Sequence, residues 1–399
     1  MTLLIDPPGS EGHGRLWSHL ASDRSYDELH RFAAELGIPR RGFDRDHYDI
    51  PAERYEQVVA AGAVPVSSRE LVRRLHEMGL RRRKSEVLGP RRPGRPLLRP
   101  RRLVPGDTVA AVAPAGPAPV DRLDAGLAVL RGWGLEVREL PHLRGRDEEL
   151  DYLAAPDVVR AAELTAAWTA PDVAAVFCAR GGYGVQRMVD LLDWPVLAEA
   201  GPKVLVGFSD VTALHQAFAS RLGVVTLHGP VVTSLGAGDD ASRDHLRRML
   251  FDPESVHDLT PMSGRVRVGG VADGVLVGGN LALLAAEVGT PTARPAARGI
   301  AVLEDVGEDP YRLDRLLTQL LRSGWFDDVR GVAVGRLTGC GSDEASRRVV
   351  EDRLAPLGVP LVTDLPFGHA DHNLTLPLGV PARLDGDAGT LTLTTTPLL

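Results

Sequence analysis

Hydrophobic positions follow two different patterns along this chain. Short runs rich in Val, Ile, Leu and Ala predict strands, whereas segments in which Leu and Ala recur every three or four residues predict helices. From about residue 103 the two patterns alternate, which is typical of a parallel sheet covered by helices, so the predicted fold class is α/β. The predicted strands are 108–113, 173–178, 204–208, 300–303, 329–335 and 390–395, and the predicted helices are 121–133, 211–222 and 311–322.

The first 84 residues indicate a separate small α/β module. A short apolar strand at 3–5 precedes helical patterns at 25–36 and 68–80. Ser67 and Glu70 stand at the spacing of a capping box, in which each side chain binds the main-chain N–H of the other residue. This pair marks the start of the second helix.

A stretch rich in Pro and Arg separates this module from the rest of the chain. Residues 85–102 follow four consecutive basic residues and hold too many prolines for a regular helix, so we predict a linker there. Turn-rich sequence between 252 and 274 predicts a further boundary. The expected organisation is a module at 1–84, an α/β domain at 103–255 and a β-rich C-terminal domain at 265–399.

Composition narrows the classes of function. Apolar residues make up 44% and charged residues 25% of the 399 residues, as in soluble globular proteins. The net charge of -7 argues against a nucleic-acid or membrane-surface binder, because such proteins usually carry positive charge. Cys178 and Cys340 are too few for a disulfide scaffold or a four-thiolate zinc site. With no apolar run of membrane-spanning length and no signal-peptide pattern before Asp6, we expect a cytoplasmic protein.

Ser209 stands where a predicted buried strand turns into a helix. The sequence from residue 204 to 211 is Val-Leu-Val-Gly-Phe-Ser-Asp-Val. A serine at a tight strand-to-helix turn is raised above the sheet edge, next to main-chain N–H groups that can stabilise an oxyanion. Gly207 gives the turn room, but Val211 stands where such turns usually have a second glycine. The alternative is that Ser209 only caps the following helix.

A glycine-rich loop follows the preceding predicted strand. Arg180 is followed there by Gly181 and Gly182, and glycines allow a close approach of the backbone. One interpretation is a cradle for an anion or oxyanion beside Ser209, completed by the main-chain N–H of Asp210. Arg180 could then meet a substrate carboxylate. The other interpretation is an ordinary flexible turn.

An acid and a histidine are candidates for the charge partners of the serine. Glu304 comes directly after a predicted strand, at the sheet edge where parallel sheets carry their active sites. His369 lies on a loop rich in Pro and Gly and suits a general base near neutral pH. The alternative for the acids is capping of the next helix, a role that suits Asp309 and Glu308 better than Glu304.

Other histidines leave alternatives open. His369 and His372 have the spacing of a two-histidine metal pair, but no nearby Cys or Glu completes a ligand set. Solvent exposure on the loop is the simpler role for His372. His228 is a minor rival for the general base, and His215 is expected to pack in its helix or face solvent.

Five segments together resemble the LD-carboxypeptidase family of serine peptidases, over about residues 103–397. They are, in order, Ala-Arg-Gly-Gly-Tyr-Gly, Val-Gly-Phe-Ser-Asp-Val-Thr-Ala-Leu-His, Gly-Gly-Asn-Leu, Leu-Glu-Asp-Val-Gly-Glu and Pro-Phe-Gly-His. The resemblance implies a catalytic triad of Ser209, Glu304 and His369. It also implies an α/β layer and a C-terminal β-rich domain with the active site between them, and commonly a homodimer.

The resemblance also implies a class of substrate. Family members hydrolyse the amide between a diamino acid and a terminal D-alanine in cytoplasmic murein peptides, during cell-wall recycling. A sister group that resembles microcin C immunity peptidases cleaves aminoacyl-nucleotide conjugates instead. The Arg-Gly-Gly-Tyr-Gly form of the loop is more similar to the carboxypeptidase branch.

The N-terminal module is similar to a small bacterial domain family of unknown function, so the resemblance assigns it no role. The similarity lies in segments such as Trp-Ser-His-Leu at 17–20 and Asp-His-Tyr-Asp at 46–49. Surface and packing roles are favoured for its polar residues. A metal or hydrolytic site is the alternative, from the side chains of Asp6, His19, Asp23, His30 and His47.

Two hypotheses of different class follow. In the first, an enzyme acts on a small peptide without metal or cofactor: Ser209 attacks the carbonyl, His369 transfers the proton, and Glu304 orients the imidazole. In the second, a non-catalytic protein binds peptides or nucleic acid through the arginine-rich stretch. The complete triad favours the enzyme. The arginines also lack the interleaved aromatic residues that stack on bases, so we expect neither a nucleic-acid nor a membrane partner.

Overall fold

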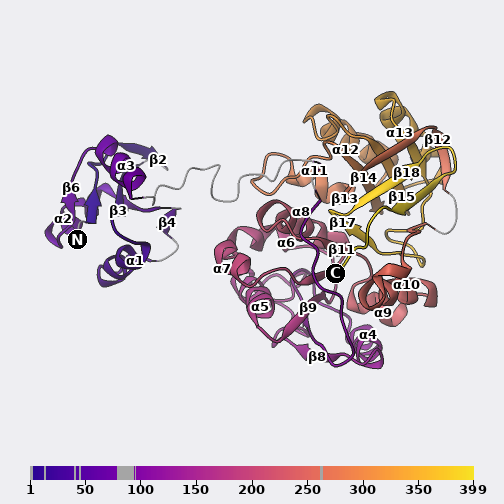
Figure 1. Cartoon of the computed structure of the whole chain (residues 1–399), viewed down its shortest axis with the longest axis horizontal. Helices are drawn as coiled ribbons and strands as arrows, with labels where there is room; N and C mark the ends of the chain where they lie inside the picture. Colours follow the sequence, from indigo (N-terminus) through magenta and orange to yellow (C-terminus); the bar gives the residue numbers. More distant parts are fainter. Residues whose placement is uncertain are drawn as a thin grey trace. The chain divides into compact units, whose positions relative to one another are not determined.

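The chain forms two compact units, residues 1–89 and 90–399 (Figure 1). None of the helices in the described part of the chain is long and apolar enough to cross a bilayer. The four basic residues at 81–84 and most of the predicted linker lie outside the described residues. The computed structural model describes residues 3–12, 15–39, 42–44, 46–78, 94, 96–260 and 264–399.

A mixed sheet with helices on both faces forms the first unit. Its strands are ordered β4-β5-β3-β1-β6, and β2 pairs with β3. The strands are β1 (Leu3–Ile5), β2 (Ser10–Gly12), β3 (Arg15–Ser22), β4 (Phe43–Asp44), β5 (His47–Pro51) and β6 (Val64–Pro65). The helices are α1 (Tyr26–Glu35), α2 (Tyr55–Ala60) and α3 (Ser68–Glu77).

Alternation of side chains along β3 gives each face of this sheet its own core. Leu20 packs in a cluster with Leu29 of α1, whereas Ala21 packs with Leu71 of α3 on the opposite face. The hydroxyl of Ser67 accepts a hydrogen bond from the main-chain N–H of Glu70, at 3.2 Å. The predicted start of this helix is therefore confirmed.

A six-stranded sheet carries the first half of the second unit. Strands β8, β7, β9, β10 and β11 run parallel to one another, and β17 lies antiparallel at the edge beside β11. The strands are β7 (Thr108–Val112), β8 (Glu136–Glu139), β9 (Val173–Cys178), β10 (Val204–Gly207), β11 (Thr226–His228) and β17 (Leu376–Leu378). The helices around it are α4 (Val120–Gly132), α5 (Asp157–Thr169), α6 (Val185–Met188), α7 (Trp194–Glu199), α8 (Thr212–Arg221), α9 (Val232–Ala237) and α10 (Asp240–Phe251).

Helices cover this sheet on both faces, which explains the continuous apolar runs of its strands. Every residue of β9 is buried. Phe177 packs in the cluster that includes α4, α9 and α10, and Val176 packs in the cluster that includes α5 and α8. Such two-sided burial is the rule for parallel sheets.

A seven-stranded sheet forms the second half. Its order is β12-β16-β15-β14-β13-β18-β19, and three helices pack against one face. The part predicted as β-rich is thus a mixed α/β layer. The strands are β12 (Arg265–Val268), β13 (Val271–Asn280), β14 (Gly299–Val306), β15 (Gly331–Thr338), β16 (Leu361–Thr363), β18 (Pro381–Asp385) and β19 (Thr390–Leu393), and the helices are α11 (Leu281–Glu287), α12 (Pro310–Arg322) and α13 (Asp343–Leu354).

Strand β17 ties the two halves of the second unit together. It belongs to the C-terminal half by sequence, yet Leu376 pairs with His228 of the first sheet. Val206 of the first sheet and Val302 of the second belong to one hydrophobic cluster. The two halves therefore share one core, which the division at 255–265 did not predict.

The end of the predicted linker is packed onto the second unit. The N–H of Leu97 donates to the carbonyl of Gly379, and Leu98 forms a bridge with Val224. The Leu97 side chain is buried. Leu97 and Leu98 thus make contacts with the second unit that the neighbouring prolines do not prevent. Residues 97–102 therefore belong to the folded unit and not to a free linker.

Candidate active site

Ser209 lies in a strained turn at the end of β10. Its φ is 66°, in the left-handed region that a residue with a side chain rarely adopts. The turn Ser209–Val211 leads directly into α8. The turn has Phe208 as its N-cap and α8 has Val211, and neither has a side-chain cap hydrogen bond, so the interpretation of Ser209 as a helix cap is wrong. The geometry is that of a serine lifted out of the sheet edge.

Gly207 and Val211 explain the unusual sequence of this turn. A Cβ at position 207 would lie 2.8 Å from Cγ1 of Val211, so the glycine makes room for the valine that replaces a second glycine. The buried ring of His215 holds the strand end, because its Nε2 donates to the Gly207 carbonyl at 2.8 Å. Its Nδ1 lies 2.9 Å from Oγ1 of Thr226. The packing role expected for His215 is confirmed, and the solvent-facing alternative is wrong.

The glycine-rich loop lies directly against Ser209. A Cβ added to Gly181 would lie 2.6 Å from Cβ and 2.9 Å from Oγ of Ser209. The next residue, Gly182, has a φ of 107°, and the N–H of Gly116 donates to the Gly181 carbonyl. This close packing favours the cradle interpretation over a flexible turn.

The charged groups of Arg180 and Asp210 are each bonded to the main chain of another segment. Nη1 of Arg180 donates to the carbonyl of Pro117 at 2.7 Å. The carboxylate of Asp210 is buried and accepts a hydrogen bond from the N–H of Val185 at 2.8 Å. Burial raises the pKa of Asp210 to about 6, against the lowering effect of this hydrogen bond. Asp210 can therefore serve the oxyanion through its main-chain N–H and not through its carboxylate.

Glu304 and His369 form a hydrogen-bonded pair beside this turn. Nδ1 of His369 lies 2.6 Å from Oε2 of the fully buried Glu304. Gly368 permits this approach, because a Cβ there would lie 2.7 Å from Cβ of Glu304. The ring of His369 packs on Phe208, with 4.7 Å between ring centroids, and Phe208 immediately precedes Ser209. No hydrogen bond joins Ser209 and His369 in the described structure, as is often so in ligand-free enzymes.

Electrostatics around this pair favour a basic imidazole. Burial opposes protonation of His369, but the hydrogen bond to Glu304 and the charges of Glu304 and Asp305 outweigh it, so the pKa of His369 is raised. For the neighbouring carboxyl group of Asp305, burial raises the pKa to about 6. The Asp305 carboxylate accepts hydrogen bonds from the side-chain amide of Asn280 and from the main-chain N–H groups of Ala282 and Val306.

The other histidines are not placed for the chemistry. His228 is fully buried, and among the described residues neither of its ring nitrogens has a hydrogen-bond partner. Burial lowers its pKa well below the ordinary value. Nδ1 of His372 pairs with Asp239 at 2.7 Å, whereas His369 faces Glu304. Because they bind different carboxylates, the pair is not arranged as a metal site.

A cavity of about 570 Å³ opens beside His369. Arg122, an exposed residue of α4, and Arg243 contribute cations to it. Of the predicted site residues only His369 is among those that line it; Ser209, Glu304 and Arg180 are not. No sequence motif pointed to Arg122, because only the packing of α4 brings it near His369. The lining also includes Phe208, Pro230, Thr233, Ser234, Asp239, Val306 and Thr338.

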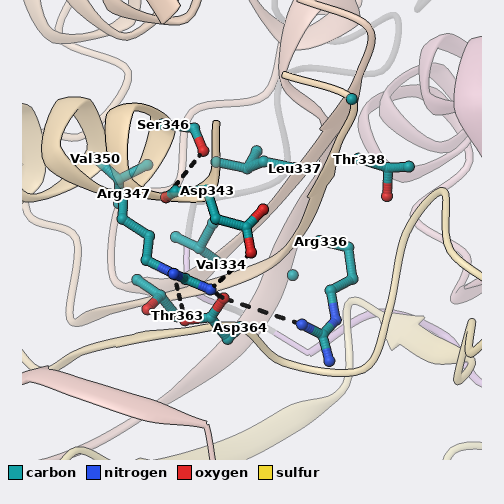
Figure 2. A pocket seen from close by; sticks show the side chains of 12 residues that line it. Val334, Arg336, Leu337, Thr338, Asp343, Ser346, Arg347, Val350, Thr363 and Asp364 are labelled. Atoms are coloured by element: carbon teal, nitrogen blue, oxygen red, sulfur yellow. Dashed lines mark hydrogen bonds and ion pairs between the residues drawn. The ribbon is translucent and has the colours of Figure 1, made fainter. Parts of the chain in front are cut away.

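A second cavity, of about 250 Å³, lies between β15 and α13. Figure 2 shows Arg347 there, pointing toward Asp364 and Asp343, with N–O distances of 3.1 Å and 3.2 Å. Its charged groups thus neutralise one another, and none of the predicted catalytic side chains lines it. We therefore place the candidate active site at the first cavity.

Family models match both units of the chain. The LD-carboxypeptidase N-terminal domain matches residues 109–229, and the LD-carboxypeptidase C-terminal domain matches residues 273–384. A protein family of unknown function, DUF4031, matches residues 3–78. The predicted similarity of the N-terminal module to a family of unknown function is therefore confirmed.

Individual relatives agree with these matches. The chain is 58% identical over 301 residues to a Streptomyces coelicolor protein provisionally named a carboxypeptidase, covering 75% of this chain and 97% of the relative. It is 37% identical over 290 residues to the murein tetrapeptide carboxypeptidase of Pseudomonas aeruginosa, covering 70% and 93%.

Solved structures show the same fold. The muramoyltetrapeptide carboxypeptidase from Oxalobacter formigenes is 31% identical with a TM-score of 0.62, over 72% of this chain and 97% of that one. MccF in complex with glutamyl sulfamoyl guanosine is 23% identical with a TM-score of 0.67, over 76% and 100%, which bears on the fold alone. With its two family domains, its carboxypeptidase relatives and this fold, the chain belongs to the LD-carboxypeptidase family.

Proposed function

We propose that the chain is a serine carboxypeptidase that removes a terminal D-alanine from murein peptides. The observation that carries the proposal is the 2.6 Å pair of His369 and Glu304 beside the strained turn of Ser209. A buried acid acts on the imidazole with little solvent screening. The names of the 37% and 31% identical relatives support the choice of murein peptides.

The proposed reaction proceeds through an acyl-enzyme. Oγ of Ser209 attacks the scissile carbonyl carbon, and its proton passes to Nε2 of His369. Glu304 accepts the Nδ1–H bond and so keeps Nε2 as the basic nitrogen. His369 then protonates the leaving amine, which departs as free D-alanine. A water molecule, deprotonated by His369, hydrolyses the ester and restores Ser209.

Main-chain donors are assigned to the oxyanion. The N–H of Asp210 follows the nucleophile directly, and the loop at Gly181 and Gly182 packs against Ser209. Each such donor contributes on the order of 3 kcal/mol in known hydrolases. Because the donors belong to the backbone, the proposed chemistry needs no metal. From the family resemblance we also propose a cytoplasmic location, tested by cell fractionation, and a homodimer, tested by sedimentation of the purified chain.

Replacement of the nucleophile tests the mechanism. The full chain is incubated with L-alanyl-D-glutamyl-diaminopimelyl-D-alanine, and products are identified by mass spectrometry. The wild-type chain should release one alanine, and Ser209→Ala should release none while keeping the same melting temperature. Ser220→Ala, a serine of α8 outside the site, is the matched control and should remain active. Turnover by Ser209→Ala would refute the assignment.

A second substrate separates the two branches of the family. An aminoacyl-sulfamoyl adenosine is offered under the same conditions, because a chain of the same fold is known in complex with glutamyl sulfamoyl guanosine. Release of alanine from the tetrapeptide supports the murein assignment. Cleavage of the nucleotide conjugate alone would contradict that substrate and retain the triad, since both reactions use one acyl-enzyme chemistry and differ in the pocket.

A further inference from the structure

Two histidines and an aspartate meet on one face of the sheet in the first unit. Strands β3 and β5 run antiparallel with His19 opposite Asp49, and His47 lies two residues before Asp49, on the same face. Nε2 of His47 is 3.3 Å from Oδ1 of Asp49, and Nε2 of His19 is 4.0 Å from the same oxygen. One ligand atom from each side chain lies within 4.8 Å of the other two.

Each imidazole of this cluster is held from behind by a buried carboxylate. Nδ1 of His19 lies 2.9 Å from Oδ2 of Asp6, and Nδ1 of His47 lies 2.7 Å from Oδ1 of Asp46. Asp6 is itself fixed by the hydroxyl of Ser68 at 2.6 Å. A carboxylate on Nδ1 fixes the tautomer and presents Nε2 as the ligand atom, which is the usual outer support of a metal-binding histidine.

The cluster opens to solvent on one side. The side chain of His47 is 10% exposed, whereas those of His19 and Asp49 are 29% and 45% exposed. On the same face, Ala21 packs in an apolar cluster with Leu71 of α3. Three protein ligands with an open side are typical of metal sites that also bind water or a small molecule.

We propose that His19, His47 and Asp49 bind one divalent transition-metal ion, with its remaining coordination positions open to solvent. Two imidazoles and one carboxylate suit Zn²⁺ and neighbouring metals, and disfavour Mg²⁺ and Ca²⁺, which prefer oxygen ligands. Bond lengths of about 2.0–2.1 Å place tetrahedral ligands about 3.3 Å apart. The spacing of His47 and Asp49 already meets this value, and His19 needs to approach Asp49 by roughly 0.7 Å and His47 by at most about 1.5 Å.

A proton is the competing occupant of the cluster. Burial opposes protonation of His47, but hydrogen bonds to Asp46 and Asp49 outweigh it and raise its pKa to about 9. An imidazolium between two carboxylates would also be compatible with this geometry. Direct measurement of metal binding distinguishes the two, because a metal requires the deprotonated Nε2 atoms.

Of the five residues that the sequence suggested for a metal or hydrolytic site, the structure brings three together and places two elsewhere. Asp6, His19 and His47 belong to the cluster, whereas His30 bonds to the hydroxyl of Tyr48 at 2.8 Å and Asp23 faces Arg74 at 3.5 Å. The third ligand, Asp49, was not among the five.

Metal titration of the full chain tests the proposal. The protein is stripped with EDTA, dialysed and titrated with Co²⁺ and then Zn²⁺, with binding followed by the visible Co²⁺ spectrum and by metal analysis. We expect one equivalent per chain. His19→Gln should weaken affinity at least 100-fold, and Asp46→Asn should weaken it about 10- to 100-fold through the outer support. His257→Gln, an exposed histidine of the second unit, and Ser209→Ala should bind as the wild-type chain does.

Two results would overturn the site. One is a stripped chain that gives no Co²⁺ spectrum and no bound equivalent. The other is an affinity unchanged in both His19→Gln and Asp46→Asn, which would place any bound metal elsewhere. Circular dichroism checks that each variant is folded. His19 is part-exposed and at the rim, so its variant carries the test even if a substitution at the more buried His47 unfolds the unit.

Discussion

The backbone at Gly181 lies so close to Ser209 that a methyl group does not fit between them: a Cβ would come within 2.6 Å of the serine Cβ. We predict that Gly181→Ala shifts Ser209 and lowers kcat/KM by about 100-fold, the typical cost of a misplacement of about 1 Å. Gly132→Ala is the control, because a Cβ there meets nothing within 4 Å. Equal activity of the two variants would show that the loop does not position the serine.

The charge of Glu304 should set the acidic limit of activity. His369 must be neutral to act as a base, and its pKa is raised, so the rate should fall as pH drops through a value above about 6.5. In Glu304→Gln the raising charge is gone. The inflection should move to lower pH and kcat should fall on the order of 10³- to 10⁴-fold.

Two measurements check this expectation. The pH dependence of kcat/KM gives the inflection, and NMR titration of His369 gives it even where activity is too low. Glu308→Gln, on the same segment but outside the pair, should leave both unchanged. An inflection that stays in place in Glu304→Gln would contradict the proposed pairing.

Arg122 should recognise the substrate carboxylate, because it is an exposed cation in the lining of the cavity at His369, whereas the guanidinium of Arg243 is bonded to the carbonyls of Leu235 and Gly238. Loss of one charged hydrogen bond costs about 1.5–3 kcal/mol. Arg122→Gln should therefore raise KM for the tetrapeptide by roughly 10- to 100-fold with little change in kcat. Arg180→Gln, whose guanidinium is bonded to Pro117, is the comparison. A larger increase of KM in Arg180→Gln than in Arg122→Gln would instead support Arg180 as the partner of the substrate carboxylate.

Acid should destabilise the second unit through its buried neutral histidines. Burial lowers the pKa of His215 to about 4, so the folded unit excludes a proton that the unfolded chain takes up below about 6.5. Stability is complete above that pH and falls as pH drops toward 4, by about 3 kcal/mol for this residue. The melting temperature should have a shallower pH slope in His215→Gln than in His257→Gln. Equal slopes would contradict the buried-neutral state.

The catalytic unit should function without residues 1–89, provided that the segment at 97–102 is kept. Leu97 is buried, and its N–H is bonded to Gly379. Loss of a buried leucine costs about 2–5 kcal/mol. Fragment 90–399 should retain full kcat, and fragment 103–399 should melt several degrees lower. An inactive but folded fragment 90–399 would indicate that the first unit contributes to catalysis.

Local sequence was enough to propose the three candidate catalytic residues, because their positions follow from short-range rules. Ser209 and Glu304 lie at the carboxyl ends of apolar strands, and the Pro- and Gly-rich loop predicted a reachable His369. Gly368 had no role assigned from the sequence; its φ of 104° and its close approach to Glu304 are seen only in the structure.

Long-range packing explains what the sequence did not predict. Arg122 reaches the cavity only through the packing of α4, and Leu376 joins the first sheet only after the chain returns from the second. In the first unit, strand register decides the cluster: it places Asp49 opposite His19, while Tyr48 points to the other face and bonds to His30 of α1. Spacing along one segment contains no information about such register.

The late strand β17 has a consequence for synthesis on the ribosome. Its partner β11 emerges some 150 residues earlier, so the edge of the first sheet stays unpaired while most of the second sheet is still being made. An open edge of this kind pairs readily with other chains. We expect a truncated nascent chain that ends before residue 376 to aggregate or recruit chaperones, even though it already contains Ser209 and Glu304. Ser209, Glu304 and His369 thus all precede, along the chain, the strand that completes the sheet carrying the serine.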